Sequence, residues 1–307
     1  MLTRVQIAYL KIVVAMFLWG ATYHAAKELV QELDIYTSSA IRWGIAALVL
    51  VIMFYQKKSL RGFIQPFRNW IIILAIGIFA IGVYNIFFFA AEARIPANLV
   101  AVIIAITPCI TVICSRVFFK EAINFLTLIG IVIAFCGAVL VINVSGCGNL
   151  WCNNLIINLN FGELLAFLMA ICAVAYNLLL KKSARLGMDG LTVTTLSSLV
   201  GAVFLIIVAG LKGKYLTIMN LSNHAWWMIF YLAIFGSVLG YKWYSDGVKE
   251  IKVSQAVVFV NTIPLTSIIT GILFFNSPVT YLFVMAALIV IAGVIITNYS
   301  LINKKKI

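Results

Sequence analysis

Polar and aromatic side chains interrupt several long apolar runs in this sequence. The most unusual is Arg42, because an ionisable residue inside an apolar run usually faces a cavity or a partner. Other residues within or beside the runs supply aromatic faces and uncharged hydrogen-bonding groups: Trp19, Tyr23, Tyr84, Asn85, Phe88, Asn98, Tyr176, Asn177, Tyr241, Tyr244, Gln255 and Asn261. This mixture suits a partly apolar solute with a polar head. For any one of these residues, helix packing or an interhelical hydrogen bond is an equal alternative.

Three roles are open to Arg42 from the sequence alone. It can line a cavity, pair with Glu92 or Glu32, or extend its long side chain to the membrane interface. Its position near one end of an apolar run is compatible with all three roles.

Three titratable residues are candidates for coupling to protons. Glu92 and Glu163 stand at the ends of apolar runs, where a partly desolvated carboxylate can titrate. His24 can titrate near neutral pH. The alternatives are solvated loop charges and, for His24, a hydrogen-bonded interfacial histidine.

Two prolines fall near the middle of apolar runs. Pro108 and Pro264 each remove one backbone donor and tend to kink a helix, which would free a carbonyl near Ile104 or Val260. We expect either a gating hinge or a static kink at each proline.

Cys147 and Cys152 share a polar loop, and they form a disulfide if that loop lies in an oxidising compartment. Whether they are bonded stays open. Two cysteines without nearby histidine do not make a structural zinc site, which needs four ligands. We therefore predict no metal site and no cofactor.

The composition excludes a water-soluble fold. Of 307 residues, 64% are hydrophobic and 10% are charged, whereas soluble domains carry about a quarter charged residues. The mean hydropathy is +1.13. The net charge of +13 resembles that of nucleic-acid-binding proteins, but the basic residues sit in short segments between apolar runs, where they set membrane topology.

Ten apolar runs have the length that a membrane-spanning helix needs, about 20 residues. Their approximate limits are 7–26, 36–55, 70–91, 95–116, 125–144, 161–180, 191–211, 225–244, 253–274 and 279–299. With the N-terminus inside, the basic residues gather on the inner side, and only Lys27, Arg94, Lys212 and Lys214 fall outside. Both termini are therefore predicted to be cytoplasmic.

The chain also repeats itself. Pro108, Phe118, Phe119, Phe125 and Gly137 align at one constant offset with Pro264, Phe274, Phe275, Tyr281 and Gly293. We predict a first five-helix repeat over 1–145, an outer loop over 146–160 and a second five-helix repeat over 161–307. Because five is odd, the second repeat enters the membrane from the opposite side, which gives the inverted repeats of many secondary transporters.

The pattern of residues resembles the EamA-type members of the drug/metabolite transporter superfamily over nearly the whole chain. The resemblance rests on a set of spaced residues: Trp19-Gly20, Arg42, Pro108, Glu121, Gly130 and Gly137. The second half departs from it, since Ser277, Pro278 and Ala286 stand where Glu121, Ala122 and Gly130 would repeat. Symmetrical roles for the two motif copies therefore cannot be assumed.

This resemblance implies a secondary transporter that exports a small metabolite such as an amino acid. Uptake or exchange of a nucleotide-type metabolite such as S-adenosylmethionine is the alternative within transport, and a non-transporting scaffold or receptor is the alternative outside it. No catalytic constellation occurs in the sequence, so an enzyme is not expected.

The expected partners are a small-molecule substrate and the lipid bilayer, with proton coupling left open and no nucleic acid. The protein is expected to be a monomer or homodimer in a bacterial inner membrane, with several spans and both termini cytoplasmic.

Overall fold

A computed structural model describes residues 3–57, 65–120, 123–147, 160–213, 215–250, 259–260 and 262–303. All regular secondary structure in these residues is helical, and no strand occurs among them. The helices are α1 (Arg4–Glu32), α2 (Ile35–Lys57), α3 (Phe67–Ala75), η2 (Ile76–Val83), α4 (Tyr84–Glu92), α5 (Ala97–Ile104), α6 (Thr107–Phe119), α7 (Phe125–Cys147), α8 (Phe161–Arg185), α9 (Gly190–Lys212), η3 (Tyr215–Asn220), α10 (Asn223–Phe230), η4 (Tyr231–Leu239), α11 (Gly240–Glu250), α13 (Ile263–Phe275) and α14 (Tyr281–Asn303).

Eight helical stretches in the described residues are long and apolar enough to cross a membrane. They coincide with the first eight predicted spans, within a few residues at each end. Two shorter apolar helices, Ile263–Phe275 and Tyr281–Thr297, fall in the last two predicted spans. Part of the ninth predicted span lies outside the described residues, so the count of ten stays a prediction.

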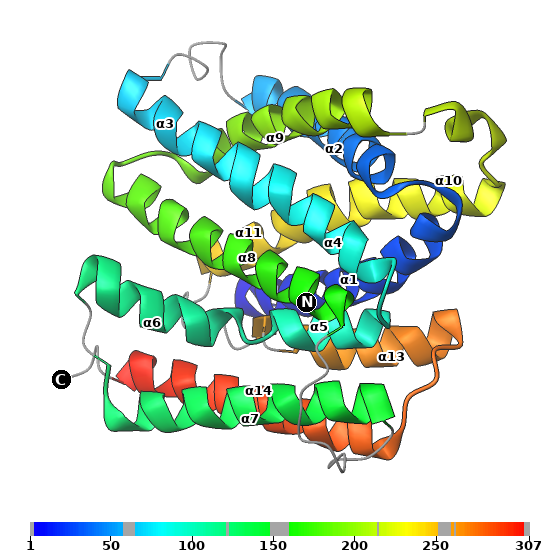
Figure 1. Ribbon diagram of the computed structural model, residues 1–307. Helices are drawn as coiled ribbons and strands as arrows, with labels where there is room; N and C mark the ends of the chain where they lie inside the picture. The colour runs from blue at the N-terminus through cyan, green and yellow to red at the C-terminus, as the bar shows by residue number, and fades with distance from the viewer. Residues whose placement is uncertain are drawn as a thin grey trace.

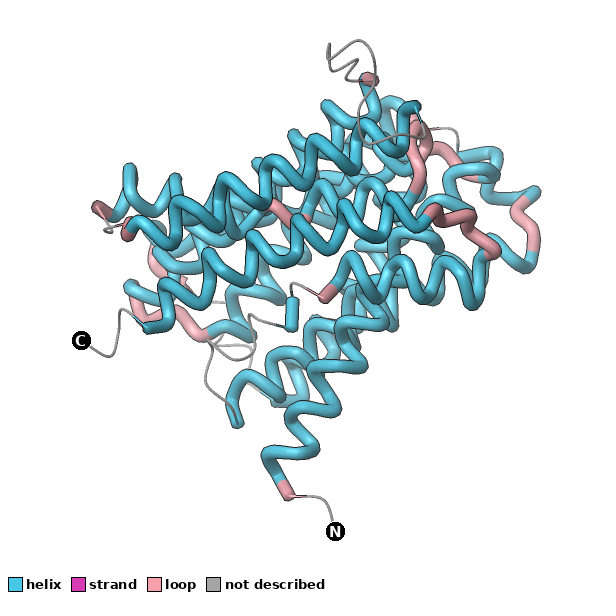
Figure 2. Tube along the Cα trace, turned by 90° about the horizontal axis from the view of Figure 1, so that it is seen from below, coloured by secondary structure: helices cyan, strands magenta, loops and turns pink. Residues whose placement is uncertain are grey.

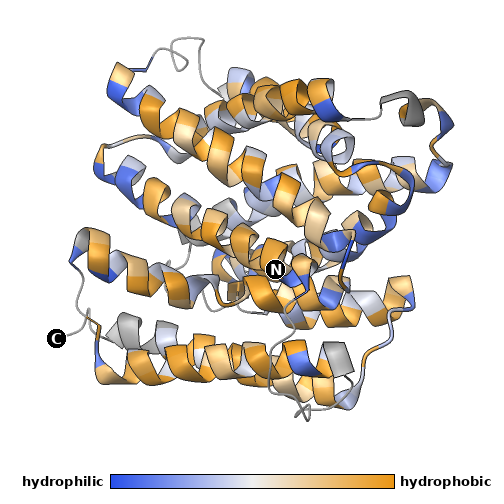
Figure 3. Cartoon of the chain, viewed as in Figure 1, coloured by the Kyte–Doolittle hydropathy of each residue, from blue (hydrophilic) through white to orange (hydrophobic). Residues whose placement is uncertain are grey.

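The helices run between two ends of a bundle, and the connecting segments lie at those ends (Figure 1). Hydrophilic residues gather toward the same two ends, while the stretches between them are mostly hydrophobic (Figure 3). Seen from below, the tube remains a packed set of helices with most loops at its margins and short non-helical breaks inside it (Figure 2). This distribution suits a bilayer, in which each helix satisfies its own backbone hydrogen bonds.

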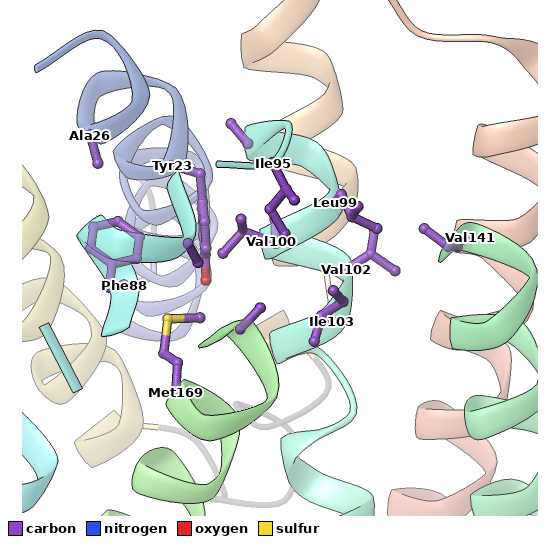
Figure 4. Close-up of a cluster of buried hydrophobic side chains, with 14 of the residues drawn as sticks. Tyr23, Ala26, Phe88, Ile95, Leu99, Val100, Val102, Ile103, Val141 and Met169 are labelled. Atoms are coloured by element: carbon purple, nitrogen blue, oxygen red, sulfur yellow. The ribbon is translucent and has the colours of Figure 1, made fainter. Parts of the chain in front are cut away.

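The largest buried cluster joins α1, α4, α5, α7, α8 and α14. On α5, Leu99 and Val102 point toward Val141 of α7, while Tyr23, Phe88 and Met169 lie on the other side of α5 (Figure 4). α5 is thus enclosed between two groups of helices, and this burial fixes the helix that leads to Pro108.

Two spans contain π-helical segments that the sequence pattern did not reveal. The predicted continuous helix 70–91 is α3, η2 and α4, and the predicted helix 225–244 is α10, η4 and the start of α11. A π turn displaces the regular hydrogen bonds and exposes carbonyls to other donors. In η4, the Gly236 carbonyl accepts a hydrogen bond from Trp19 Nε1 at 3.0 Å.

The proline kinks are breaks between separate helices. α5 ends at Ile104, and α6 begins at Thr107 with Pro108 in its first turn. Proline fits there because the first N–H groups of a helix have no intrahelical acceptor. The carbonyl of Ile104, expected to be free, accepts a hydrogen bond from Thr107 Oγ1 at 2.6 Å.

The same arrangement recurs at α13, which has Pro264 in its first turn. Just before it, Thr262 Oγ1 donates to the carbonyl of Phe259 at 2.6 Å. This carbonyl belongs to the residue before Val260, near which a free carbonyl was predicted. The helices α6 and α13 also end alike, because their C-caps, Lys120 and Asn276, both have positive φ angles of 55° and 47°.

Glycines form packing seams inside the chain. A Cβ on Gly130 would meet Thr297 and the Gly293 carbonyl, and a Cβ on Gly137 would meet the Val290 backbone nitrogen at 2.7 Å. α7 and α14 therefore touch along their backbones. Gly236 and Gly240 similarly face Thr22 and Trp19 of α1, so both pairs of glycines serve contacts within the bundle.

Candidate functional site: a central cavity

A cavity of about 260 Å³ lies among the helices. Its walls come from α1, α2, η2, α4, α5, α6, α8, α9, η4, α11 and α13, and from Val260. It gathers nine predicted contact residues and both prolines: Trp19, Tyr23, Arg42, Tyr84, Asn85, Phe88, Tyr176, Asn177, Tyr241, Pro108 and Pro264. Residues far apart in the sequence thus converge on one cavity.

Arg42 of α2 lies in the cavity wall with 8% of its surface exposed. Its Nε donates to Ser237 Oγ of η4 at 3.1 Å, and its Nη1 donates to Asn85 Oδ1 of α4 at 3.4 Å. Among the described residues, no carboxylate pairs with it. The geometry therefore agrees with the cavity-lining role and contradicts both the Glu92 or Glu32 pair and the extended interfacial position.

The ring of Phe88 lies under the guanidinium, with 5.3 Å from Arg42 Cζ to the ring centroid. Tyr23 packs edge-on against Phe88, with 5.7 Å between ring centroids, and Tyr84 stacks on it at 6.4 Å. On another wall, Trp19 meets Tyr241 with 5.1 Å between centroids. Aromatic faces therefore hold the one arginine in place and form much of the lining.

Asn85 is oriented by its own backbone contact. Its Nδ2 donates to the Ile81 carbonyl of η2 at 2.8 Å, which leaves Oδ1 turned toward Arg42. Ser237 is held in a similar way, because its hydroxyl donates to the Leu232 carbonyl at 3.0 Å. Both π-helical segments thus help to position the partners of the guanidinium.

Sequence reasoning missed several lining residues. They are mostly small hydroxyl residues, joined by one tryptophan: Thr22, Trp43, Thr107, Thr194, Ser197, Ser198 and Ser237. Serine and threonine are common in membrane helices, where they bond to their own backbone, so residue type alone does not mark them. The run Thr194 to Ser198 in α9 is the one signal that was available.

Asn98 and His24 lie outside the cavity, in a buried network between α1, α5 and α13. His24 Nε2 lies 3.0 Å from both Asn98 Oδ1 and the Ser267 carbonyl, and Asn98 Nδ2 donates to Ser277 Oγ at 3.2 Å. The imidazole also stacks on Phe275. These contacts give both residues a structural role in joining the three helices.

The two acidic candidates occupy different surroundings. Glu163 accepts a hydrogen bond from the Asn160 backbone nitrogen at 2.8 Å and so caps α8. Glu92 is fully buried at the end of α4, and its carboxyl oxygens have no hydrogen-bond partner among the described residues. Lys27 lies beside it, donating to the Glu92 main-chain carbonyl at 2.6 Å and to that of Ile95 at 3.0 Å.

The remaining candidates do not line the cavity or are not described. Tyr244 packs against Trp19 with 5.3 Å between ring centroids, behind the cavity wall. Gln255, Asn261 and Cys152 lie outside the described residues, and so does the proposed disulfide with Cys147. In the part of the chain that is described, no group of three or more His, Cys, Asp or Glu side chains is arranged to hold a metal ion.

Comparison with known families decides the assignment. The EamA-like transporter family matches residues 6–143 and again residues 160–299. The chain belongs to the EamA-like transporter family. It is accordingly a multi-pass membrane protein of a transporter family, as the residues Trp19-Gly20, Arg42 and Pro108 suggested.

Two relatives of this EamA-like transporter are described as uncharacterised transporters. It is 30% identical to the uncharacterised transporter YyaM of Bacillus subtilis, over 90% of this chain and 88% of that one. It is 26% identical to an uncharacterised transporter of Archaeoglobus fulgidus, over 91% and 94%. One solved crystal structure shares the fold with a TM-score of 0.66 at 16% identity, over 97% of this chain and 98% of that one.

Proposed function

We propose that this EamA-like transporter is a secondary transporter that exports a small metabolite, such as an amino acid, by alternating access. The observation that carries the proposal is the central cavity. Its walls include α1, α2, α4 and α6 from the first part of the chain and α8, α9, α11 and α13 from the second. A site between two such parts is exposed to each side in turn when the parts rock against one another.

Inverted five-helix repeats, with ten spans in all, are part of this proposal. Equivalent features support a duplication: both η2 and η4 are π-helical, both α6 and α13 begin with a proline, and both end in a left-handed cap. The two separate family matches, 6–143 and 160–299, also agree with two repeats. The odd number of predicted helices in each repeat would invert one against the other.

Hinge motion is proposed at the two helix breaks. Pro108 and Pro264 line the cavity at the start of α6 and α13, directly after backbone that does not continue the preceding helix. A break can bend without loss of regular hydrogen bonds, so α6 and α13 can move while α5 stays packed in the core.

Proton coupling is assigned in this proposal to Glu92 rather than to Glu163 or His24. Glu92 is one turn from Phe88 of the cavity wall, and its buried carboxyl has no hydrogen-bond partner among the described residues. A buried carboxyl without a partner is costly to ionise, so a change in its exposure would change its protonation. Glu163 and His24 are instead held by the capping and network contacts.

The alternative of a nucleotide-type substrate is less well supported. The cavity of about 260 Å³ is below the range of about 300–1,000 Å³ that drug-sized ligands occupy. The solute is therefore expected to be closer to an amino acid in size. A scaffold would not need such a cavity, and a receptor would bind a ligand there without moving it across the membrane.

The test is to fill the cavity in purified protein reconstituted into liposomes that are loaded with a labelled amino-acid mixture. Ala173→Trp places an indole in the cavity from α8 and should abolish efflux. Ile171→Trp, on the exposed side of the same helix, is the matched control and should retain it. Equal efflux from both variants would refute the cavity as the transport site, and no efflux from the unmodified protein would refute amino-acid export.

A further inference from the structure

The guanidinium of Arg42 is incompletely paired. It has five N–H donors, and the described partners, Ser237 and Asn85, take one hydrogen bond each from Nε and Nη1. Nη2 donates to neither. Nη2 lies beside η4, 3.8 Å from where a Cβ on Gly236 would stand, and Arg42 itself lines the cavity.

The cavity also lacks a compensating charge. Arg42 is the only charged side chain among its described lining residues, and the other ionisable groups in the lining are the hydroxyls of Tyr23, Tyr84, Tyr176 and Tyr241. Burying a cation without an anionic partner is costly. The rings of Phe88 and Trp43, at 5.3 and 6.0 Å, offset only part of that cost.

The shape of the guanidinium limits which kind of anion can pair with Arg42. An arginine offers parallel N–H groups that match the two oxygens of a carboxylate. A phosphate monoester carries close to two charges and three acceptor oxygens, for which the described lining supplies no second cation. One arginine in a small cavity therefore matches one carboxylate.

The rest of the lining favours an apolar body. Aliphatic side chains of Leu50, Ile104, Val260 and Ile263 line the cavity together with the ring of Tyr176. Hydroxyl and amide groups supply only neutral hydrogen bonds. A solute with one carboxylate and an aliphatic or aromatic remainder would satisfy both the charge and the surface.

We infer that the cavity recognises small organic acids, such as apolar amino acids, by a carboxylate bound to the free edge of the Arg42 guanidinium. The inference rests on the proposed transport function and adds its substrate class. Solutes with a net positive charge are excluded, because they would meet a cation with no counter-charge in the described lining. Ser237 and Asn85 are positioning residues that hold the guanidinium against Phe88.

The test compares ligands that differ only in charge at the carboxyl carbon. The purified full-length chain is titrated with L-leucine, L-phenylalanine and 3-phenylpropionate, and with the corresponding amides, while thermal stability and tryptophan fluorescence are followed. A ligand that binds the folded state raises its stability. Trp19 and Trp43 line the cavity and should report binding. Carboxylates should bind and amides should not.

Variants of Arg42 test whether its guanidinium binds the carboxylate. Arg42→Gln should weaken carboxylate binding about ten- to a hundred-fold, the range expected for loss of a charged hydrogen-bonded partner. Arg42→Lys should retain part of it. Arg94→Gln is the matched control, because Arg94 also lies over a ring, that of Phe161 at 5.3 Å, but outside the cavity. Each variant is first shown to be folded by its unliganded melting temperature.

The outcomes separate this inference from the proposed transport. Equal binding of acids and amides, an unchanged preference in Arg42→Gln, or binding of neither class would overturn the carboxylate assignment. Efflux of solutes that lack a carboxylate would leave transport standing and also overturn it. Carboxylate binding that depends on Arg42 without any flux would support the site and refute transport.

Discussion

At the scale of single residues, buried hydroxyls separate into those that complete a backbone hydrogen bond and those that do not. Thr107 Oγ1 bonds to the Ile104 carbonyl at the break between α5 and α6. Thr37 Oγ1 is buried without a partner among the described residues. Replacing these two similarly buried threonines is therefore expected to have opposite effects on stability.

We predict that Thr107→Val lowers the free energy of unfolding by about 1–3 kcal/mol, the cost of an unpaired buried carbonyl. Thr37→Val should be neutral or stabilising, because it removes a hydroxyl that bonds to nothing in the described structure. Melting temperatures in one detergent provide the comparison. Equal destabilisation by both changes would show that the bond at the break is unimportant.

Glu92 allows a second prediction at this scale. Glu92→Gln keeps the size of the side chain but cannot release a proton, so transport driven by a pH gradient should fall to background. Exchange of labelled for unlabelled solute needs no net proton movement and should persist. Glu163→Gln, which alters a helix cap, should retain both activities. Loss of exchange in Glu92→Gln would indicate a structural role instead.

Residue types in the sequence were enough to predict much of the cavity but not its boundary. Arginine, tyrosine, tryptophan and asparagine are uncommon in apolar runs, so eight of the nine proposed contacts that line the cavity could be named by type, with Phe88 as the ninth. The distinction between Asn85 in the cavity and Asn98 in a buried network depends on how α4 and α5 pack. Spacing along the chain does not carry that information.

At the scale of helices, backbone contact along the α7–α14 seam is the feature most sensitive to change. A Cβ on Gly293 would meet the Ala134 backbone nitrogen and the Gly130 carbonyl, neither of which can turn aside as a side chain can. Gly44 of α2 has no atom within 4 Å of the corresponding point.

We therefore predict that Gly293→Ala destabilises the protein by more than about 1 kcal/mol, the lower part of the range for overpacked cores. Gly44→Ala should be neutral or slightly stabilising, as expected for glycine replaced in a helix. Thermal unfolding of the two variants checks this. A neutral Gly293→Ala would mean that α7 and α14 separate readily.

The helix breaks give a prediction about motion. Pro108→Ala restores a backbone donor and allows α5 and α6 to join more continuously, so turnover should fall while ligand affinity changes little. Pro96→Ala, at the start of α5 and away from the cavity, is the control. Rates in liposomes and binding by thermal shift separate the two effects. Unchanged turnover would make the break a static feature.

The sequence predicted the positions of these elements better than their internal geometry. Apolar length located the first eight spans, but the π-helical segments η2 and η4 were missed. A π turn shifts hydrogen bonds by one residue and leaves an apolar run equally apolar. The two prolines correctly located the interruptions of the helices. Each proline lies in the first turn of a new helix, however, and not at a kink within a continuous one.

At the scale of the whole molecule, orientation in the membrane is predicted from the basic residues and can be measured directly. Single cysteines at Asn223 and Met188 would lie at opposite ends of the bundle, beside α10 and between α8 and α9. In a cysteine-free background, an impermeant thiol reagent should label Asn223→Cys in intact cells and Met188→Cys only after permeabilisation. The reverse pattern would place both termini outside.

The unbalanced charge of Arg42 also has a consequence for the membrane voltage. Because Arg42 stays with the protein, a solute whose only charge is its carboxylate, such as 3-phenylpropionate, carries one negative charge out of the cell when it is released outside, whereas a zwitterionic amino acid carries none. A potential of 100 mV, negative inside, contributes about 2.3 kcal/mol per charge. That is about fifty-fold in the concentration ratio of the anion. A cavity whose one described charge is positive thus allows the resting potential itself to drive the export of a net anion.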